Sequence, residues 1–306
     1  MQSVPEKPAW LNRVAILGVG MLGGSVGMSL RRRGIQVRGY SRRESSCRQA
    51  VDAGAIDQGF TDIRSACRGC EVVVIASPVD KIPELAARAD QALDGDALIT
   101  DVGSTKARII QEIESLSPSA SQKFVAAHPI AGSEKTGVEN SRGSLLDGKI
   151  VIVTPRDNTP DALLSRSKVF WRQTGSQIVS MTPQEHDQRL AAVSHVPHLV
   201  SSLLASLLDD ESMPLVGSGW KDMTRVASGD PMMWTAICAH NRDAILSQID
   251  RLSDELLRLK EKVADDETTA LTRWLQAAKE RKDQLSLIHI SEPTRQWSGS
   301  RMPSSA

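Results

Sequence analysis

Two polar residues that could do acid–base chemistry follow apolar runs in the first half of the chain. His128 ends the run KFVAAH (123–128), and Ser104 follows the run ALITDV (97–102). An imidazole with a pKa near its usual ~6.5 can act as a general base at neutral pH, so His128 is a candidate catalytic base at the mouth of a cofactor site. Taken alone, HPIAGSEKTG (128–137) favours a strand end followed by a surface turn, because His-Pro and glycine-rich loops are common turn sequences.

A second group of polar residues lies in the second half of the chain. A buried arginine is the natural anchor for a substrate carboxylate, because its guanidinium makes paired, charge-assisted hydrogen bonds. Each residue here also has a simpler explanation. The histidines could be core residues bonded to the backbone, Arg225 could pair with Asp222 on a helix surface, and Trp234 could be ordinary core. The candidate substrate-binding residues are His195, His198, Lys221, Asp222, Arg225 and Trp234.

A glycine motif directly follows the first apolar run, RVAILG (13–18). Gly18, Gly20 and Gly23 have the spacing G-x-G-x-x-G. The first glycine permits a tight turn, the second lets the backbone approach a pyrophosphate, and the third lets helix and strand pack closely. The free N–H groups at the helix start would face the phosphates, so this context predicts a dinucleotide site. The candidate cofactor-binding residues in this part of the site are Gly18, Gly20, Met21, Leu22, Gly23, Ser77 and Asp101.

The end of the second apolar run bears on which dinucleotide binds. An NAD site usually has an acidic residue about 20 residues beyond the glycine motif, where it binds the ribose. The sequence GYSRR (39–43) instead has Ser41, followed by Arg42 and Arg43. A serine can donate to a 2′-phosphate and a guanidinium can clamp it, although the two arginines could also simply begin a solvated helix. The sequence therefore favours NADP over NAD.

Alternating strand-like and helical segments must position these residues. Continuous Val and Ile runs are typical of strands that are covered on both faces. The pattern predicts an α/β fold, with a Rossmann-type domain over residues 11–158 built on a mainly parallel sheet. The expected strands are 13–18, 36–40, 71–76, 97–102, 123–128 and 149–154, and helical spacing runs through 21–33, 44–53, 79–92 and 105–115.

The second half is mainly helical, and we expect an all-helical substrate and dimerisation domain over residues 159–284. After one more strand-like run at 176–181, helical spacing covers 183–209, much of 231–262, and 264–285. Long helices with few local partners often pack against a copy of themselves, so a homodimer is expected, although a bundle within one chain would also explain the pattern. The apolar face that suggests this pairing consists of Ile245, Ile249, Leu252, Leu256, Leu259 and Val263.

The segment 285–306 fits neither pattern. It is rich in Ser, Arg and Pro, and LSLIHISEPTR (285–295) is similar to translated sequencing-adapter sequence that is found appended to unrelated chains. We interpret it as a disordered tail or an appended segment and assign no role to His289.

Composition narrows the function classes. Lysine plus arginine and aspartate plus glutamate number 37 each in 306 residues, so the net charge is zero and no nucleic-acid partner is predicted. The chain begins without an apolar signal region and has no apolar run of 18 residues, so we predict a cytoplasmic protein with no membrane partner. Cys67 and Cys70 form a lone C-x-x-C without the further ligands of a zinc site, so no metal is predicted.

The order of motifs resembles that of the prephenate/arogenate dehydrogenase family of tyrosine biosynthesis. The resemblance covers the chain to about residue 284. It implies a nucleotide-binding domain, a helical dimerisation domain, and NAD(P)-dependent oxidative decarboxylation of prephenate or arogenate, with the choice between these substrates left open. The matching motifs are GVGMLGGS (18–25), DVGSTK (101–106), HPIAGSEKTG (128–137), HDQRLAAVSHVPH (186–198) and KDMTRVASGDPMMW (221–234).

The resemblance also implies roles for the candidate residues. His128 would polarise the ring hydroxyl, Ser104 would hold it, and Arg225 would bind a carboxylate. Ser41 departs from the acid that is common in NAD-using members, which puts NAD use in doubt without affecting the catalytic residues. The residues implied to line the pocket, or to lie near Arg225, are His195, His198, Lys221, Asp222 and Trp234.

Two other function classes share parts of this pattern. A β-hydroxyacid dehydrogenase or pyrroline carboxylate reductase would have the glycine motif and a helical second domain, but would need a lysine or another donor in place of His128. A non-enzymatic NADP-sensing protein would keep the cofactor site with a vestigial pocket. The nearly complete set of acid–base and anion-binding residues argues against the sensor.

Overall fold

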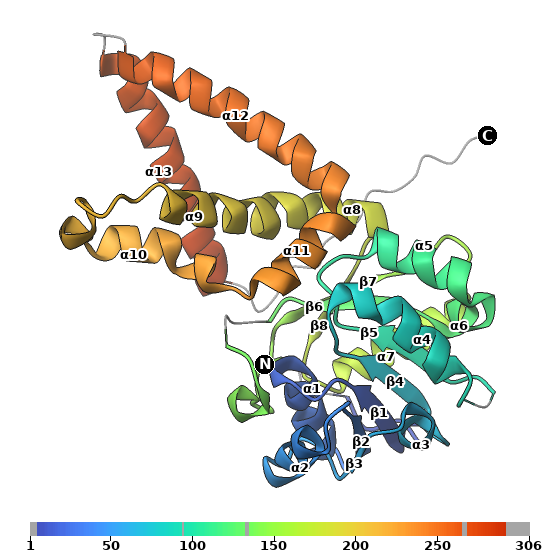
Figure 1. The fold of residues 1–306 in the computed structure, drawn as a ribbon. Coiled ribbons are helices and arrows are strands. Elements are labelled where there is room, and N and C mark those ends of the chain that lie inside the picture. The colour runs from blue at the N-terminus through green and yellow to red at the C-terminus, as the bar shows by residue number, and fades with distance from the viewer. Residues whose placement is uncertain (1–4, 94, 132–134, 265–267, 292–306) are drawn as a thin grey trace, which may run out of the picture. The chain divides into compact units, whose positions relative to one another are not determined.

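The computed structural model describes residues 5–93, 95–131, 135–264 and 268–291 (Figure 1). The chain divides into two compact units, one that extends to Ile249 and one that begins at Asp250. The first unit holds both sheets and all the candidate site residues. The second consists of the end of one long helix and the helix that follows it.

A five-stranded parallel sheet forms the first part of the larger unit and confirms the predicted Rossmann-type fold. Its strand order is β3-β2-β1-β4-β5, so the chain begins mid-sheet, moves to one edge and then crosses to the other side of β1. The carboxyl end of β1 is therefore the switch point at which open α/β sheets bind ligands. The strands are β1 (Arg13–Leu17), β2 (Gln36–Tyr40), β3 (Gln58–Phe60), β4 (Val72–Ile75) and β5 (Leu98–Asp101).

The strands of this sheet enter two cores, one on each face. In β1, Val14 and Ile16 pack into one core while Ala15 and Leu17 pack into the other, and all four are fully buried. Burial on both faces is the reason that these strands have continuous rather than alternating apolar runs. Helices α3 (Ile63–Cys67), α4 (Ile82–Asp90), α5 (Ala107–Leu116) and α6 (Pro118–Lys123) contribute to the Ala15 side, and α1 (Met21–Arg31), α2 (Glu44–Asp52) and α7 (Asp161–Arg172) to the Val14 side.

The last three strands form a second sheet, whereas the sequence alone suggested one continuous sheet. β7 pairs antiparallel with β6 and parallel with β8. Within the described residues, an isolated bridge from Ile99 to Phe124 joins the chain before β6 to β5. An apolar run shows that a strand is buried but does not specify its partner, so this pairing could not be predicted. The strands are β6 (Ala126–Pro129), β7 (Ile150–Thr154) and β8 (Gln177–Ser180).

The pairing of β8 with β7 carries the sheet-containing part of the chain beyond the predicted boundary at residue 158. Ile152 lies opposite Val179 in this parallel pair. Parallel neighbours need a crossover connection, and α7 supplies it. The helix and strand after residue 158 therefore complete a strand–helix–strand unit of the first part, and the wholly helical part begins after Ser180.

The helical part begins with one long predicted helix that is interrupted. A π-helical turn at Ala191–His195 separates α8 from α9, and such turns are frequent at functional sites. Helices α8 (Pro183–Leu190), α9 (Val196–Ser206), α10 (Ser218–Thr224) and α11 (Pro231–His240) follow one another, and short 3-10 turns lie at Val79–Lys81, Val138–Asn140, Met213–Leu215 and Arg225–Ser228.

Two long helices end the described chain, α12 (Arg242–Ala264) and α13 (Thr268–Ser291). The backbone at 285–291 continues α13, and the rest of the segment that we interpreted as a tail lies outside the described residues. No helix of the described chain is long and apolar enough to cross a bilayer. Several large apolar side chains are exposed in the single chain, among them Leu246, Leu256, Leu257, Val263, Trp274 and Leu275.

Candidate active site

The glycine motif connects β1 to α1 at the switch point of the sheet. Gly18 has a φ of 108°, and a Cβ there would lie 2.1 Å from the carbonyl oxygen of Ala76. A Cβ at Gly23 would lie 2.1 Å from the carbonyl oxygen of Gly18. At Gly20, the N-cap of α1, a Cβ would meet nothing within 4 Å. Gly18 and Gly23 are thus required by packing, whereas Gly20 leaves the start of α1 open, as a pyrophosphate site requires.

The end of β2 has the polar residues expected near a ribose. Ser41 is half-buried, and its hydroxyl accepts the backbone N–H of Arg43 at 3.4 Å. Arg42 and Arg43 are exposed, and Arg43 is the N-cap of α2. The two guanidinium groups are therefore free of the core and accessible to a phosphate at this edge.

The other candidates for the dinucleotide lie at the same switch point. The Ser77 hydroxyl donates to the carbonyl oxygen of Leu17 at 3.1 Å, which places Ser77 beside the Gly18 turn. Met21 and Leu22 occupy the first turn of α1 and are half-buried. These contacts fit the predicted dinucleotide site.

Asp101, the last residue of β5, has its carboxylate fully occupied inside the protein. One oxygen accepts hydrogen bonds from Lys106 Nζ and from the N–H of Gly103, the latter at 2.9 Å. The other oxygen accepts the N–H of Ala127 at 2.9 Å. Lys106 is also fully buried; burial lowers its pKa, and Asp101 opposes that shift. The sequence suggests a cofactor contact for Asp101, and in the structure its carboxylate fixes the loop after β5 against β6, the strand that carries His128.

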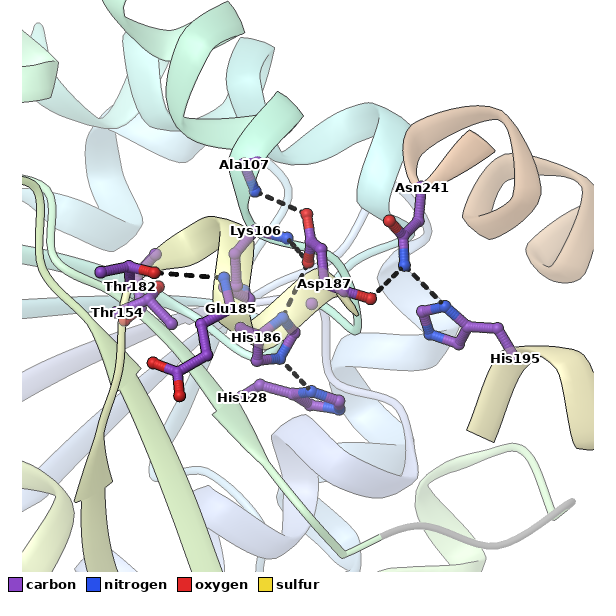
Figure 2. A network of polar contacts seen from close by, with 12 residues as sticks. Lys106, Ala107, His128, Thr154, Thr182, Glu185, His186, Asp187, His195 and Asn241 are labelled. Atoms are coloured by element: carbon purple, nitrogen blue, oxygen red, sulfur yellow. Dashed lines mark hydrogen bonds and ion pairs between the residues drawn. The ribbon is translucent and has the colours of Figure 1, made fainter. Parts of the chain in front are cut away.

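His128 lies at one end of a chain of polar contacts (Figure 2). Its Nδ1 is 2.9 Å from Nε2 of His186, and Nδ1 of His186 is 2.8 Å from an oxygen of Asp187. His128 is half-buried, His186 is fully buried, and Asp187 is almost so. The buried members of the chain therefore hold an imidazole that remains partly accessible.

Helix α8 presents His186 and Asp187 because its start is well defined by sequence. The hydroxyl of Thr182 accepts the N–H of Glu185 at 3.1 Å, and Pro183 occupies the first turn. A Thr followed three residues later by Glu is the sequence of a capping box, and Pro is favoured where the N–H would have no partner. The residues of the network follow directly in the next turn.

Asp187 also caps a helix other than its own. Its two carboxylate oxygens accept the N–H groups of Lys106 at 2.8 Å and Ala107 at 2.9 Å, at the start of α5. The N-cap residue of α5 is a lysine that makes no side-chain cap of its own. A carboxylate at this end is favoured by the helix dipole and satisfies N–H groups that would otherwise be unpaired. One residue of α8 therefore binds both the histidine chain and α5.

A second histidine is joined to Asp187 through Asn241, the residue between α11 and α12. Nδ2 of Asn241 is 2.8 Å from the carbonyl oxygen of Asp187 and 3.0 Å from Nδ1 of His195. His195 is nearly fully buried at the end of the π-helical turn. Its Nε2 makes no hydrogen bond with the described residues, although the backbone of Ser104 is close enough to raise the pKa of the ring. The half-buried Ser104 thus lies beside His195.

The histidines of the network are neutral at pH 7. Burial lowers the pKa of His195 to about 4. Burial also lowers the pKa of His128 well below its usual value, and the positive charge of Lys106 adds to this effect. The pKa of His186 is lowered by burial, against the opposing effect of its hydrogen bond to Asp187. Neutral imidazoles can each donate one hydrogen bond and accept another.

Trp234 packs between the two histidines of the SHVPH motif. Its ring is stacked on His198 with the ring centroids 3.5 Å apart and the planes at 8°, and it meets His195 edge-on at 6.2 Å and 80°. A cavity of about 570 Å³ is lined in part by His198, Gly229 and Trp234. The sequence left open that these residues are ordinary core. His198 and Trp234 pack against each other as core residues do, but they also line a cavity.

The predicted anion-binding segment differs in environment from the histidine network. Arg225 follows α10 directly and is exposed in the single chain, as are Lys221 and Asp222 on α10. The sequence suggested an arginine that points into a dry pocket, and this burial is not observed. Arg225 remains a prediction as the carboxylate anchor.

Sequence reasoning missed three buried residues of the site, namely His186, Asp187 and Asn241. The pair His186–Asp187 begins a motif that we singled out, so an acid next to a histidine was a usable signal. Asn241 lies in none of the motifs, and only the folded chain brings it to His195. Its role could not be predicted, because nothing local distinguishes it from an ordinary helix-ending asparagine.

Comparison with known proteins identifies the family. Residues 26–180 match the nucleotide-binding domain of prephenate dehydrogenase, and residues 182–277 match the dimerization domain of prephenate dehydrogenase. The chain belongs to the prephenate dehydrogenase family. The two matches meet just after β8, at the point where the sheets end and the helical part begins. Membership confirms the resemblance seen in the sequence and makes the protein an oxidoreductase of this family.

Individual relatives cover most of the chain. The prephenate dehydrogenase of Bacillus subtilis is 32% identical over 283 residues, which are 90% of this chain and 76% of the relative. The cyclohexadienyl dehydrogenase of Zymomonas mobilis is 27% identical over 92% of this chain and 98% of its own. The first relative is named as a dehydrogenase of prephenate and the second as a cyclohexadienyl dehydrogenase.

Solved structures agree with the fold over both domains. The prephenate dehydrogenase of Aquifex aeolicus, crystallised with hydroxyphenyl propionate and NAD⁺, superposes with a TM-score of 0.84 at 34% identity and covers 91% of this chain and 100% of that one. The arogenate dehydrogenase of Synechocystis gives a TM-score of 0.74 at 26% identity, with 89% of this chain and 99% of that chain covered.

Proposed function

We propose that this protein catalyses the NAD(P)-dependent oxidative decarboxylation of prephenate or arogenate. The observation that supports this most directly is the neutral imidazole of His128, held by His186 and Asp187 in the same unit as an open glycine motif. The names of the relatives favour the same reaction. Its substrates carry a ring hydroxyl and, across the ring, a carboxylate.

Each group of the protein has a limited task in this reaction. The bound dinucleotide supplies a hydride acceptor for the carbinol carbon. His128 accepts the hydrogen bond of the ring hydroxyl and draws off its proton as the carbon–oxygen bond becomes double. The bond to the carboxylate breaks with loss of carbon dioxide, and its electron pair enters the ring. The carbonyl pair returns to the oxygen, which takes the proton back from His128 as the phenol forms. Aromatisation provides the driving force, so the protein needs only to position the ring, accept and return one proton, and exclude water.

The lowered pKa of His128 fits a hydroxyl acceptor that releases its proton readily. Because burial and Lys106 disfavour the imidazolium, the ring stays neutral and ready to accept a hydrogen bond throughout the neutral pH range. Such assistance contributes roughly 10²- to 10⁴-fold to a rate. Ser104, which lies beside His195, would hold the same hydroxyl.

The remaining pocket residues are assigned by chemistry and by the family's pattern. Arg225 would bind a substrate carboxylate, with Lys221 and Asp222 near it on the same segment. An exposed arginine in the single chain can serve this role where a ligand covers it. His198 and Trp234 would form an apolar wall for the ring, as their stacked rings in the cavity allow.

We further propose NADP as the preferred dinucleotide and a homodimer as the working form. Ser41 with the two exposed arginines favours a 2′-phosphate over a bare ribose. The exposed apolar side chains of α12 and α13, in a segment that matches a dimerization domain, favour pairing with a second copy. Sedimentation of the purified protein would test the dimer directly.

Parallel assays test the function itself. The purified protein is given prephenate or arogenate, each with NAD and with NADP, and formation of the reduced dinucleotide is followed by absorbance. We expect turnover of at least one of the two substrates and a higher kcat/KM with NADP. Absence of turnover in all four combinations would contradict the proposed activity.

A further inference from the structure

We infer that Asp187 and Asn241 give His128 and His195 opposite proton positions. His128 carries its proton on Nδ1 and presents the lone pair of Nε2, whereas His195 carries its proton on Nε2. The use of this pair in catalysis rests on the proposed function, but the proton positions themselves do not. His186, Asp187 and Asn241 are positioning residues in this proposal.

The proton position of His128 follows from the carboxylate at the other end of the chain. Both carboxylate oxygens of Asp187 accept backbone N–H groups, so Asp187 is an acceptor here and Nδ1 of His186, at 2.8 Å, donates to it. A neutral His186 then has no proton on Nε2, which must accept. Nδ1 of His128, at 2.9 Å, is the only group in this contact that can donate to it. The lone pair of His128 is therefore left on Nε2.

The proton position of His195 follows from the amide of Asn241. If the amide oxygen faced the carbonyl of Asp187, two acceptors would meet at 2.8 Å, so the amide nitrogen occupies that position. The same nitrogen is 3.0 Å from Nδ1 of His195 and donates to it. A neutral His195 then carries its proton on Nε2. The nearby backbone of Ser104 raises the pKa of this ring, which fits a proton on it.

A single residue thus controls both rings through two different groups. The carboxylate of Asp187 orders His186 and His128, while its backbone carbonyl orders Asn241 and His195. The carboxylate and the backbone carbonyl of Asp187 are both buried and fixed in position. Neither ring is therefore free to exchange its proton position. The low pKa values of both rings keep them neutral, which is the condition that the derivation needs.

The consequence for a ligand is a fixed acceptor at His128. A hydroxyl group donates to Nε2 of His128, as the proposed oxidation requires. Nε2 of His195 is buried and has no hydrogen bond to the described residues, so its proton stays inside the protein, next to the backbone of Ser104.

Nitrogen NMR of the histidine rings measures the proton positions directly. The full-length protein labelled with ¹⁵N-histidine is studied without ligand near pH 7.5, where long-range proton–nitrogen correlations distinguish the two neutral forms of each ring. His128→Gln, His186→Gln and His195→Gln each remove one set of signals and so assign the rings. We expect Nδ1–H for His128 and His186, and Nε2–H for His195. A proton on Nε2 of His128, or on Nδ1 of His195, would overturn the inference.

A pair of substitutions at His186 separates proton control from packing. Glutamine can still accept from Nδ1 of His128 through its amide oxygen, whereas leucine fills similar space and cannot. We expect His186→Leu to give a mixed signal for His128 and a kcat about 10- to 100-fold lower, with His186→Gln within a few-fold of the parent. The dissociation constant of the dinucleotide reports that each variant is folded. Equal loss in both variants, with the His128 signals unchanged, would assign His186 a purely structural role.

A second pair tests the Asn241 arm. Asn241→Asp replaces the donor with acceptors and draws a proton to Nδ1 of His195, whereas Asn241→Leu removes the contact without reversing it. Both variants lose the hydrogen bond to the carbonyl oxygen of Asp187. They differ only in whether the proton of His195 is drawn to Nδ1. We expect Nδ1–H or a charged ring at His195 in Asn241→Asp and a mixture in Asn241→Leu. An unchanged Nε2–H signal in both would contradict this arm of the inference.

The NMR and the activity assays fail independently. If no prephenate or arogenate is turned over but the ring signals are as expected, the proposed function is wrong and the proton positions stand. If turnover is observed but His128 carries its proton on Nε2, the function stands and the positioning role of Asp187 is wrong.

Discussion

The glycine motif and the histidine network are both parts of the candidate site, but they are built in opposite ways. Gly18, Gly20 and Gly23 act through the backbone of one turn, and what they need is the absence of side chains. The network acts through side chains from β6, α8 and the junction of α11 with α12, and every member depends on another. Substitutions at the three glycines should therefore act independently of one another. In the histidine network, the loss of any one member should disturb the others.

The largest expected effect lies in the network, at its accessible end. His128→Asn removes the ring nitrogen that accepts the hydroxyl, and we expect kcat to fall by at least about 10²-fold. Binding of the dinucleotide, measured by titration, should survive because the glycine motif is untouched. Near-normal turnover would remove His128 from the mechanism and leave the network with a structural role only.

The next effect concerns Arg225, which belongs to neither region. Arg225→Gln should mainly raise KM, by about 10- to 150-fold, which corresponds to the loss of roughly 1.5–3 kcal/mol of charged hydrogen bonding. kcat at saturation should change little, because the network still acts on the hydroxyl. An unchanged KM for the substrate would move the carboxylate anchor to another residue.

Acid should weaken the network before it affects the glycine motif. The folded pKa values of His128 and His195 lie below the unfolded value of about 6.5, so the unfolded chain binds more protons between these limits. Their contribution to stability is complete above pH ~6.5 and falls as the pH drops toward 4, by about 1.4 kcal/mol for each pKa unit of difference. Urea unfolding between pH 7.5 and 4.5 measures this slope. In His195→Gln the slope should be shallower, and an identical slope would contradict the assignment.

Two substitutions within the glycine motif should separate packing from binding. Gly18→Ala places a Cβ against Ala76 at an unfavourable φ, so we expect the free energy of unfolding to fall by about 1–3 kcal/mol. Gly20→Ala meets no protein atom and should leave stability within about 0.5 kcal/mol, while dinucleotide binding weakens because the Cβ occupies the open side. Equal dinucleotide affinity in Gly20→Ala and the parent would place the pyrophosphate elsewhere.

The smallest effect is expected at the ribose end. Ser41→Asp combined with Arg42→Ala should shift the preference from NADP toward NAD, because a carboxylate repels a 2′-phosphate and the guanidinium no longer clamps it. The ratio of kcat/KM values for the two dinucleotides measures the shift. An unchanged ratio would show that other groups recognise the 2′-phosphate.

The difference between the glycine motif and the histidine network also decides how much could be predicted from the sequence. The Rossmann-type fold and the position of the glycine motif between a strand and a helix depend on local patterns, and both are confirmed by the structure. The short elements β3 and α3 were missed because three to five residues show no periodicity. The second sheet and its pairing were missed because strand partners are set by long-range packing.

The site was predictable only where one residue type suffices to suggest chemistry. His128 and His195 could be named from sequence, and the structure places both in one network. The hydrogen-bond partners that fix their protons come from residues 58 and 46 positions away. Without a pattern that links such distant positions, their pairing has no local signal.

The cap that Asp187 provides for α5 makes the sheet-containing part of the chain depend on the helical part for its histidine network. A chain that ended after Ser180 would keep its glycine motif and both sheets, yet the start of α5 would have only water for its N–H groups. In such a fragment the ring of His128 would lose its hydrogen bond to His186. Such a fragment would lack the positioned imidazole on which the proposed reaction depends, so an incomplete chain would keep the glycine motif without the partner that orders His128.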